Sequence, residues 1–329
     1  MFKNNAAYII TTIDYLAKEI PFDNTCKIFN VTTQQYYRWK NKIKCTASVL
    51  NLCFKTHPCQ LTIGECSIIK DAINEPANGR KKLSTILYSL MRMGKLFCSR
   101  STFYKYAKLV SERIIKRKGK KPAEKLIATR IFEYIHIDTT LIPTIEDGTV
   151  RAVIIKDNCS KNILHKGIVE NGNSKWIANL LHETFAMYKL LNQNELITIV
   201  SDGGSENKGE VTQWIESLDS DKIKKETART KEFLYTNNEI ESVFHIFKHE
   251  FLPNEKITNK EQVRKYLQEF QLYNNNERYP ISLHGLTPQE VFDGSIPDKN
   301  RFKTEITQAT KKRYEKNKKG RFCDVCSER

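Results

Sequence analysis

The feature that most constrains the fold is a change of hydrophobic period near Phe132. Before it, apolar residues recur about every 3.6 residues, as in amphipathic helices. After it, apolar and polar residues alternate, or β-branched residues follow one another, as in strands. The segments with these patterns are "FEYIHIDTTLI", "TVRAVIIKDN" and "KNILHKGIVE". The turn pair Asp147-Gly148 separates the first two, so the three segments predict a meander.

The segments after the meander predict helices and a further strand. "SKWIANLLHETFAMYKLL" carries a helical apolar stripe, and "ELITIVSDGG" is a short buried strand that stops at an acid. "NNEIESVFHIFKHEF" is a long amphipathic helix, and residues 259–280 are another. This order favours an α/β fold with a mixed sheet.

Two helical units precede the sheet. In residues 7–45, Pro21 interrupts a helical pattern, and a corner at "NVT" leads to a helix capped by Thr32 or Thr33. A similar arrangement follows in "LTIGECSIIKDAIN", "KKLSTILYSLMRMG" and "SRSTFYKYAK". Both spacings are typical of helix-turn-helix modules, although helical hairpins of this size also occur in proteins that never contact DNA.

The last helix of each unit carries polar and basic residues where a recognition helix would place them. They are Gln34, Gln35, Arg38 and Lys40 in the first unit, and Arg100, Thr102, Lys105 and Lys108 in the second. Residues 1–120 hold 22 Lys or Arg against 7 Asp or Glu, residues 131–300 hold 19 against 26, and the last 29 hold 10 against 4. The basic ends favour a polyanion partner, with a solvated basic surface as the alternative.

Two aspartates stand at strand positions that structure alone would not choose. Asp138 interrupts a strand, and Asp202 ends another just before two glycines. Acids are depleted in strands and costly to bury unpaired, so two of them followed by a helical glutamate favour a site for two divalent cations. Mg²⁺ prefers such oxygen ligands, and a pair of ions about 4 Å apart can drive phosphoryl transfer. We interpret Asp157, on the second strand, as structural.

Three glutamates on the "NNEIESVFHIFKHEF" helix compete for the third position. On a helical wheel, the apolar residues cluster on the side that packs on the sheet; they are Ile240, Val243, Phe244, Phe247 and Phe251. Glu241, His245 and Lys248 share one flank of that side, and Glu239 and Glu250 share the other. Only one flank can face Asp138 and Asp202, and the alternative is that all three glutamates are solvated surface charges.

These motifs carry a resemblance. "HIDTT", "IKDNCSKNILHKGI", "IVSDGGSEN", "NNEIESVFHIFKHE" and "YNNNERYPISLHGLTPQEVF", in this order, resemble the catalytic core of DDE transposases of the IS3 type and of retroviral integrases. The two helical units also resemble those of IS3-type transposases, so the resemblance covers nearly the whole chain. It implies a ribonuclease-H-like fold with a mixed five-stranded sheet and flanking helices, two Mg²⁺ or Mn²⁺ ions, and cleavage and strand transfer at DNA ends.

The resemblance also implies roles for single residues. By position, Asp138, Asp202 and Glu241 are the three metal-binding acids, and Lys248 is where relatives contact the DNA end. His245 is interpreted as a helix-flank residue near DNA, because a hard cation prefers oxygen ligands. The implied partners are double-stranded DNA, both terminal repeats and target, and further copies of the chain assembled on it.

The sequence departs from this pattern in three places. The 38 residues between Asp202 and Glu241 exceed the usual gap, which predicts a longer loop near residues 219–230. "ERYPIS" stands where relatives commonly have Arg-Pro-His. Cys323 and Cys326 have zinc-ligand spacing, but no second pair or nearby His completes a site.

Together these patterns predict the organisation of the chain. We expect helix-turn-helix modules at 1–50 and 51–115, a basic linker at 116–130, the ribonuclease-H-like core at 131–298, and a poorly ordered basic tail at 299–329. Without a signal-peptide pattern, an apolar run of about 18 residues or a cysteine framework, the chain is predicted to be soluble and cytoplasmic. Two alternatives to a transposase stay open: a DNA-binding regulator derived from one, and a structure-selective nuclease of the same fold.

Overall fold

The computed structural model describes residues 2–44, 59–110, 126–169, 174–202, 209–218, 220–228, 237–252 and 256–319. The chain divides into two compact units. The first comprises residues 1–74, 96–114 and 303–329, and the second comprises residues 75–95 and 115–302. Most of the predicted linker and both cysteines of the predicted tail lie outside the described residues.

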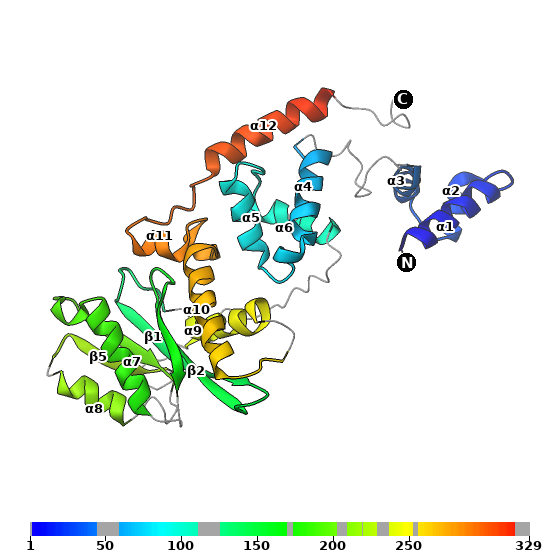
Figure 1. The fold of residues 1–329 in the computed structure, drawn as a ribbon. Coiled ribbons are helices and arrows are strands. Elements are labelled where there is room, and N and C mark those ends of the chain that lie inside the picture. The colour runs from blue at the N-terminus through cyan, green and yellow to red at the C-terminus, as the bar shows by residue number, and fades with distance from the viewer. Residues whose placement is uncertain are drawn as a thin grey trace. The chain divides into compact units, whose positions relative to one another are not determined.

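The second unit is built on one five-stranded sheet (Figure 1). Its strands are β1 (Tyr134–Pro143), β2 (Thr149–Asp157), β3 (Ile163–Val169), β4 (Ile197–Ser201) and β5 (Ile223–Thr227), in the order β3-β2-β1-β4-β5. β2 pairs antiparallel with β1 and β3, whereas β4 runs parallel to both β1 and β5. A meander extended by parallel strands confirms the predicted ribonuclease-H-like fold class.

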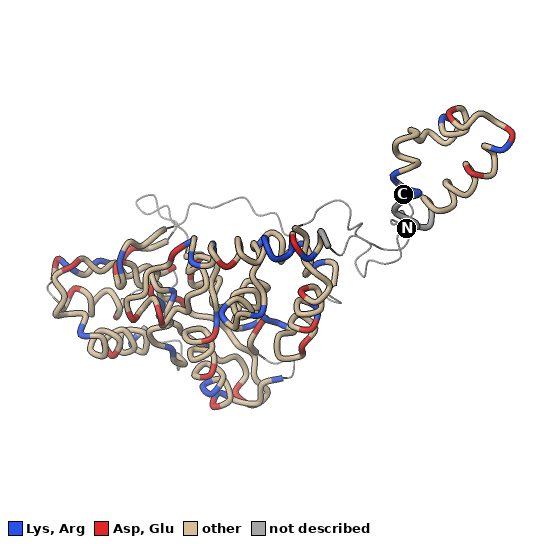
Figure 2. Tube along the Cα trace, turned by 90° about the horizontal axis from the view of Figure 1, so that it is seen from above, with Lys and Arg blue, Asp and Glu red and all other residues tan. Residues whose placement is uncertain are grey.

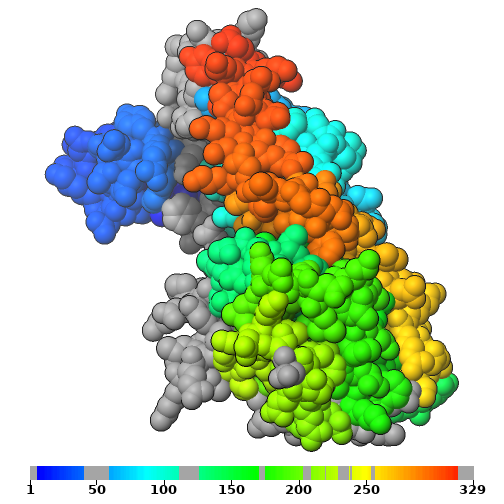
Figure 3. Space-filling view, turned by 90° about the vertical axis from the view of Figure 1, so that its left-hand side faces the viewer, coloured from blue at the N-terminus to red at the C-terminus, as the bar shows by residue number. Residues whose placement is uncertain are grey.

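Helices cover both faces of the sheet. On one face, α9 (Asn238–Ile246) and α10 (Lys260–Asn276) bury Ile240, Val243 and Phe270 against β1 and β2. On the other, α7 (Ser174–Met187) and α8 (Glu210–Ser217) cover β1, β3 and β4, and Figure 3 shows these two helices as adjoining green and yellow-green surfaces. Both faces of the central strands are therefore apolar, which explains their long β-branched runs.

Residues 75–95 belong to the second unit because their side chains contact its other parts. After a short 3₁₀ turn (Pro76–Asn78), helix α5 (Leu83–Arg92) ends in an Arg92–Glu290 ion pair at 2.8 Å. Tyr88 stacks near Phe302, with ring centroids 6.2 Å apart. The second predicted helix-turn-helix is thus divided between the two compact units, and the predicted domain boundaries stay predictions.

The first unit is helical, as predicted for the N-terminal region. It contains α1 (Phe2–Leu16), α2 (Phe22–Ile28), α3 (Thr33–Lys44), α4 (Ile63–Asn74), α6 (Arg100–Val110) and α12 (Lys303–Lys319). Thr32 caps α3, since its Oγ1 accepts from the Gln35 amide while the Gln35 side chain accepts from the Thr32 amide. Ser99 caps α6 by accepting from the amide of Thr102.

The second unit also contains short elements after α7 and α9. They are a 3₁₀ turn at Leu190–Asn192, the π-helical turn η5 (Phe247–Phe251), a 3₁₀ turn at Ile281–Leu283 and α11 (Pro288–Phe292). Within the described residues, no helix has both the length and the apolar character that crossing a bilayer requires.

Two sequence expectations were wrong. The loop expected at residues 219–230 contains the edge strand β5, which was missed because its sequence, "IKKET", has one buried apolar residue and reads as polar loop. The tail expected to be poorly ordered forms the 17-residue helix α12. Its low mean hydropathy hid the helix, which is held by polar contacts described below.

Candidate active site

The pairing of β1 with β4 ends close to the two predicted aspartates. β1 and β4 pair in parallel through Tyr134 with Thr198, Ile135 with Ile199, and His136 with Val200. Continuing this register by two residues sets Asp138 opposite Asp202, although regular pairing ends before them. Asp138 lies within β1, where it pairs with Ile154 of β2, and Asp202 directly follows the last residue of β4.

The helix with the three glutamates is anchored at this same point. Asn237, the residue before α9, does not cap the helix with its side chain. Its Nδ2 instead donates to the Ile137 carbonyl at 3.3 Å, and its Oδ1 lies 2.7 Å from His136 Nδ1. The start of α9 is therefore attached to β1 at the two residues that precede Asp138.

Glu241 follows this anchor by one helical turn. Its backbone amide donates to the Asn237 carbonyl at 3.1 Å, so Glu241 rises from the same side of α9 as the anchor. Its side chain is exposed, as are His245 and Lys248 on the predicted flank. The His245 and His249 rings lie 4.6 Å apart, on either side of the start of the π turn.

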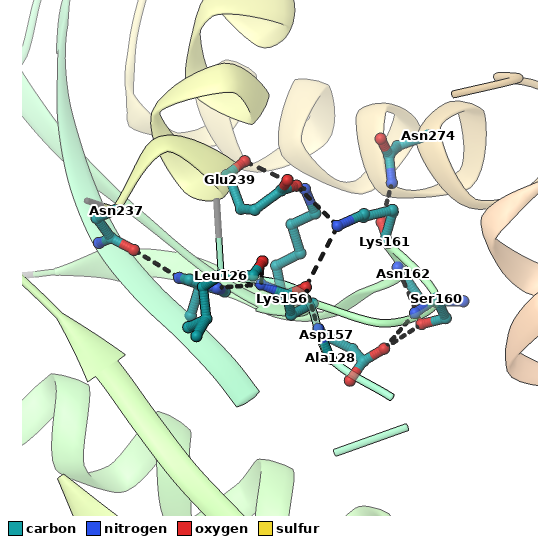
Figure 4. A network of polar contacts seen from close by, with 12 residues as sticks. Leu126, Ala128, Lys156, Asp157, Ser160, Lys161, Asn162, Asn237, Glu239 and Asn274 are labelled. Atoms are coloured by element: carbon teal, nitrogen blue, oxygen red, sulfur yellow. Dashed lines mark hydrogen bonds and ion pairs between the residues drawn. The ribbon is translucent and has the colours of Figure 1, made fainter. Parts of the chain in front are cut away.

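Glu239 is not a solvated surface charge. Its Oε2 lies 3.2 Å from the Nζ atoms of both Lys156 and Lys161 (Figure 4). Burial tends to raise the pKa of Glu239, but attraction to these two ammonium groups lowers it to about 2. Burial lowers the pKa of Lys156 to about 8, which still leaves the lysine protonated at neutral pH.

Glu250, in η5, is also used inside the protein. One carboxylate oxygen lies 3.4 Å from Lys82 Nζ, and the other is buried without a hydrogen-bond partner in the described residues. Burial raises its pKa above the ordinary value, and attraction to Lys82 opposes that shift. Of the three glutamates, the structure therefore leaves Glu241 as the one whose side chain is exposed on the flank next to the anchor.

A buried polar network lies beneath this site (Figure 4). Asn158 Nδ2 lies 2.8 Å from His136 Nε2 and 3.3 Å from the Leu126 carbonyl, while Asn158 Oδ1 accepts from the Ala128 amide. Burial lowers the pKa of His136 to about 4, and a neutral imidazole protonated at Nδ1 fits both of its contacts. The network links the start of the core, β1, β2 and α9.

Sequence analysis did not single out His136, Asn158 or Lys156. A signal existed only for Lys156, because a lysine inside the buried run "AVIIK" requires a counter-charge, and Glu239 supplies it. Asp157 is structural, as interpreted: it accepts hydrogen bonds from the Phe132 amide and from Ser160.

The predicted DNA-binding residues fall into two groups. Gln34, Arg38, Arg100, Lys105, Lys108 and Lys248 are exposed. Gln35 completes the cap of α3, Lys40 pairs with Asp14 at 2.8 Å, and the Thr102 hydroxyl lies 2.9 Å from that of Ser99. The members of the second group already have partners inside their own unit, so DNA contact by them would compete with those bonds.

The donor chemistry fits a hard cation, but the geometry is incomplete. Carboxylate oxygens on two strands and a helix suit Mg²⁺ or Mn²⁺. Among the described residues, no three Asp, Glu, His or Cys side chains lie close enough together to hold one ion. The segments 203–208 and 229–236, which flank Asp202 and α9, are outside that description.

Comparison with known families found a match to part of the second unit. The family described as "Integrase core domain" matches residues 241–291, from the predicted third acid through α10 to α11. The matched segment covers only part of the second unit, and all five strands of the sheet precede it.

The comparison with solved structures found similar folds at low identity to this chain. A chain of the simian T-cell lymphotropic virus intasome, in complex with PP2A regulatory subunit B56 gamma, gives a TM-score of 0.41 at 12% identity, over 65% of this chain and 77% of that one. The HTLV-2 integrase catalytic core with magnesium gives 0.36 at 14%, over 51% and 99%. The catalytic domain of Mos1 mariner transposase gives 0.35 at 10%, over 78% and 96%. No curated protein matched the sequence.

Proposed function

We propose that the protein is a DDE-type transposase or integrase that cleaves 3′ ends of mobile-element DNA and joins them to target DNA. One observation carries the proposal: the β1–β4 pairing ends two residues before Asp138 and Asp202, and Asn237 attaches α9 to β1 one turn before Glu241. An exposed acid on a helix that is anchored to the strand carrying Asp138 supports such chemistry.

Asp138, Asp202 and Glu241 are the residues that would hold Mg²⁺ or Mn²⁺. Two bound ions would supply charge stabilisation at the attacking and leaving oxygens of the phosphoryl transfer. Because no three acidic side chains are gathered in the described residues, we infer that DNA or metal binding brings Glu241 closer to the strand aspartates.

The chain's own residues position the substrates. The exposed flank with Glu241, His245 and Lys248 accepts the DNA end, where the lysine neutralises a phosphate. Water attacks a phosphodiester and releases a 3′ hydroxyl, and this hydroxyl then attacks a phosphodiester of the target, with the target's 3′ oxygen as leaving group. No bond to the protein forms, so the absence of a serine or tyrosine nucleophile motif is expected.

The N-terminal helices provide the DNA-end recognition in this proposal. Gln34 and Arg38 on α3, and Arg100, Lys105 and Lys108 on α6, are exposed and available to a duplex. Recognition of two ends and a target also implies further copies of the chain on the same DNA. The protein would act in the cytoplasm, where its DNA substrate lies.

The test is strand transfer with oligonucleotides taken from the DNA that flanks the gene. Wild-type protein with Mg²⁺ should shorten the 3′ strand and join it to a plasmid, and Asp138→Asn or Asp202→Asn should do neither. Cleavage without joining would favour the nuclease alternative. DNA binding without cleavage, in either metal, would favour the regulator.

A second readout does not depend on activity. Three converging carboxylates repel one another without a cation, so Mg²⁺ or Mn²⁺ should raise the melting temperature of the wild-type protein. Asp138→Asn and Asp202→Asn should each remove most of that rise. An equal rise in all three proteins would show that the metal binds elsewhere.

A further inference from the structure

Helix α12 is attached to the N-terminal helical unit by a buried arginine. The side chain of Arg313 is 5% exposed. Its Nε lies 2.8 and 3.0 Å from the two carboxylate oxygens of Glu65, and its guanidinium also donates to the Phe97 carbonyl. One turn later, Asn317 Nδ2 donates to the Gln60 carbonyl at 2.9 Å.

These acceptors lie at the starts of the two helices that flank the attachment point. Gln60 and Glu65 border the first turn of α4, where Glu65 also accepts from the Thr62 amide at 2.8 Å. Phe97 lies three residues before Arg100, the first residue of α6. The C-terminal half of α12 is therefore fixed next to the beginning of the candidate recognition helix.

The attachment is specific. Burial acts to raise the pKa of Glu65, but the bonds from Arg313 and Thr62 lower it below its ordinary value. A buried arginine needs such a partner, because an unpaired buried charge is strongly destabilising. The contact thus selects one placement of α12 in this unit, which a solvated basic tail would not require.

The rest of this half of α12 is basic and faces solvent. Lys311, Lys312 and Lys316 are exposed, and Figure 2 colours the Lys and Arg positions of the described chain blue. In the described part of the chain, none of the three lysines forms an ion pair. On α6, Arg100 and Lys105 are likewise exposed and basic. The contacts of Arg313 thus hold α12 next to the start of α6, and both helices carry exposed basic side chains.

We propose that α12 and α6 form one DNA-binding surface, in which the lysines of α12 contact phosphates of the same duplex that α6 enters. The inference rests on the proposed function, since it extends the DNA recognition assigned to the N-terminal helices. The C-terminal segment of the chain then acts in DNA binding together with helices that are far from it in sequence. Phosphate contacts of this kind position a duplex without reading its sequence.

The test uses the full-length protein and a 30-base-pair duplex of mixed sequence, titrated over a range of salt concentrations. The variant Lys311→Gln, Lys312→Gln, Lys316→Gln should bind about tenfold or more weakly at 0.1 M salt. Its slope of log affinity against log salt should flatten by up to about 2.7, or about 0.9 for each lost phosphate contact. The matched control, Lys224→Gln, Lys265→Gln, Lys299→Gln, removes the same charge from exposed sites in the catalytic unit and should leave the slope unchanged.

Each result decides the inference. Equal slopes in wild type and the α12 variant overturn it, and so does the same loss in the control, which would be an effect of net charge alone. The number of duplexes bound per protein distinguishes one shared surface from two separate surfaces. If wild type binds two duplexes and the α12 variant binds one, the inference is also overturned. If wild type binds no duplex even at low salt, the DNA recognition in the proposed function fails as well.

Discussion

The two flanks of α9 place the same type of side chain in opposite surroundings. On one flank, Glu239 is closed in by Lys156 and Lys161, with a quarter of its side chain exposed. On the other, two residues and about 200° further round the helix, Glu241 is exposed. The first flank fixes the helix to β2 and to the turn after it, and the second presents a carboxylate to solvent.

This difference separates glutamates that hold the fold from the one assigned to chemistry. A carboxylate that pairs with a positive charge inside the protein stabilises the fold, so its removal should lower the free energy of unfolding. A carboxylate that pairs with metal and substrate should instead affect the reaction rate when it is removed. Substitution by glutamine removes the charge and keeps the shape, and it therefore tests both flanks in the same way.

The largest effect is expected for Glu241→Gln. It should lower 3′-end cleavage and strand transfer by at least about 10³-fold, or about 4 kcal/mol of barrier, with duplex affinity unchanged. Glu239→Gln should keep activity within about tenfold, when both are assayed where the proteins are fully folded. An active Glu241→Gln protein, or a folded but inactive Glu239→Gln protein, would show that the flanks are assigned the wrong way round.

The stability effect should be the reverse. Glu239→Gln leaves Lys156, whose side chain is 3% exposed, without its full counter-charge. Breaking a buried ion pair costs about 3–5 kcal/mol, and we expect about 2–3 kcal/mol here because Glu239 keeps some contact with water. Urea unfolding measures this change in the free energy of unfolding. The matched control, Glu241→Gln, should unfold with a free energy within about 0.5 kcal/mol of wild type.

A double-variant cycle sharpens this prediction. Lys156→Met combined with Glu239→Gln removes the uncompensated ammonium, so the pair should be more stable than Glu239→Gln alone by about half of the loss or more. If the double variant loses as much stability as the two single variants added together, the ion pair does not account for the stability of this flank.

A smaller effect on rate is expected at the anchor between the flanks. Asn237→Ala removes the bond to the Ile137 carbonyl and leaves His136 without one of its two partners. The start of α9 is then less firmly held, and strand transfer should fall by about tenfold while duplex affinity stays the same. Asn276→Ala, at an exposed position of α10, is the control. If duplex affinity and rate fall equally, Asn237 contacts the DNA and does not act by positioning Glu241.

The sequence predicted much of this site because its signals are local. Asp138 and Asp202 conflict with strand propensity, and the wheel of α9 separates Glu241 from Glu239 by face. The buried partner of Glu239 was not predictable in this way, since Lys156 and Lys161 meet it only after β2 and α9 are packed together. In the same way, the polar sequences of β5 and α12 hold no periodic apolar signal, and contacts distant in sequence fix them.

The third glutamate, Glu250, should give the smallest effect. Its single ion pair, with Lys82, is 3.4 Å long, and its other oxygen is buried without a hydrogen-bond partner in the described residues. Burial raises the pKa of Glu250 and lowers that of Lys82, so for both groups burial outweighs their attraction. Unlike the pair at Glu239, this pair adds little, and Glu250→Gln should change the free energy of unfolding by less than about 1 kcal/mol at neutral pH.

The pH dependence of this variant tests the cause. Because the folded-state pKa of Glu250 lies above its unfolded value, the folded state binds the extra proton between the two, and this contribution to stability is lost as pH rises through the folded pKa. In urea unfolding, the stability of Glu250→Gln relative to wild type should therefore increase between pH 4 and pH 8. The matched control Glu277→Gln, at an exposed position, should show no such increase. A Glu250→Gln protein that loses stability relative to wild type as pH rises would mean that Glu250, like Glu239, is held charged by its partner, and the contrast between the two glutamates would fail.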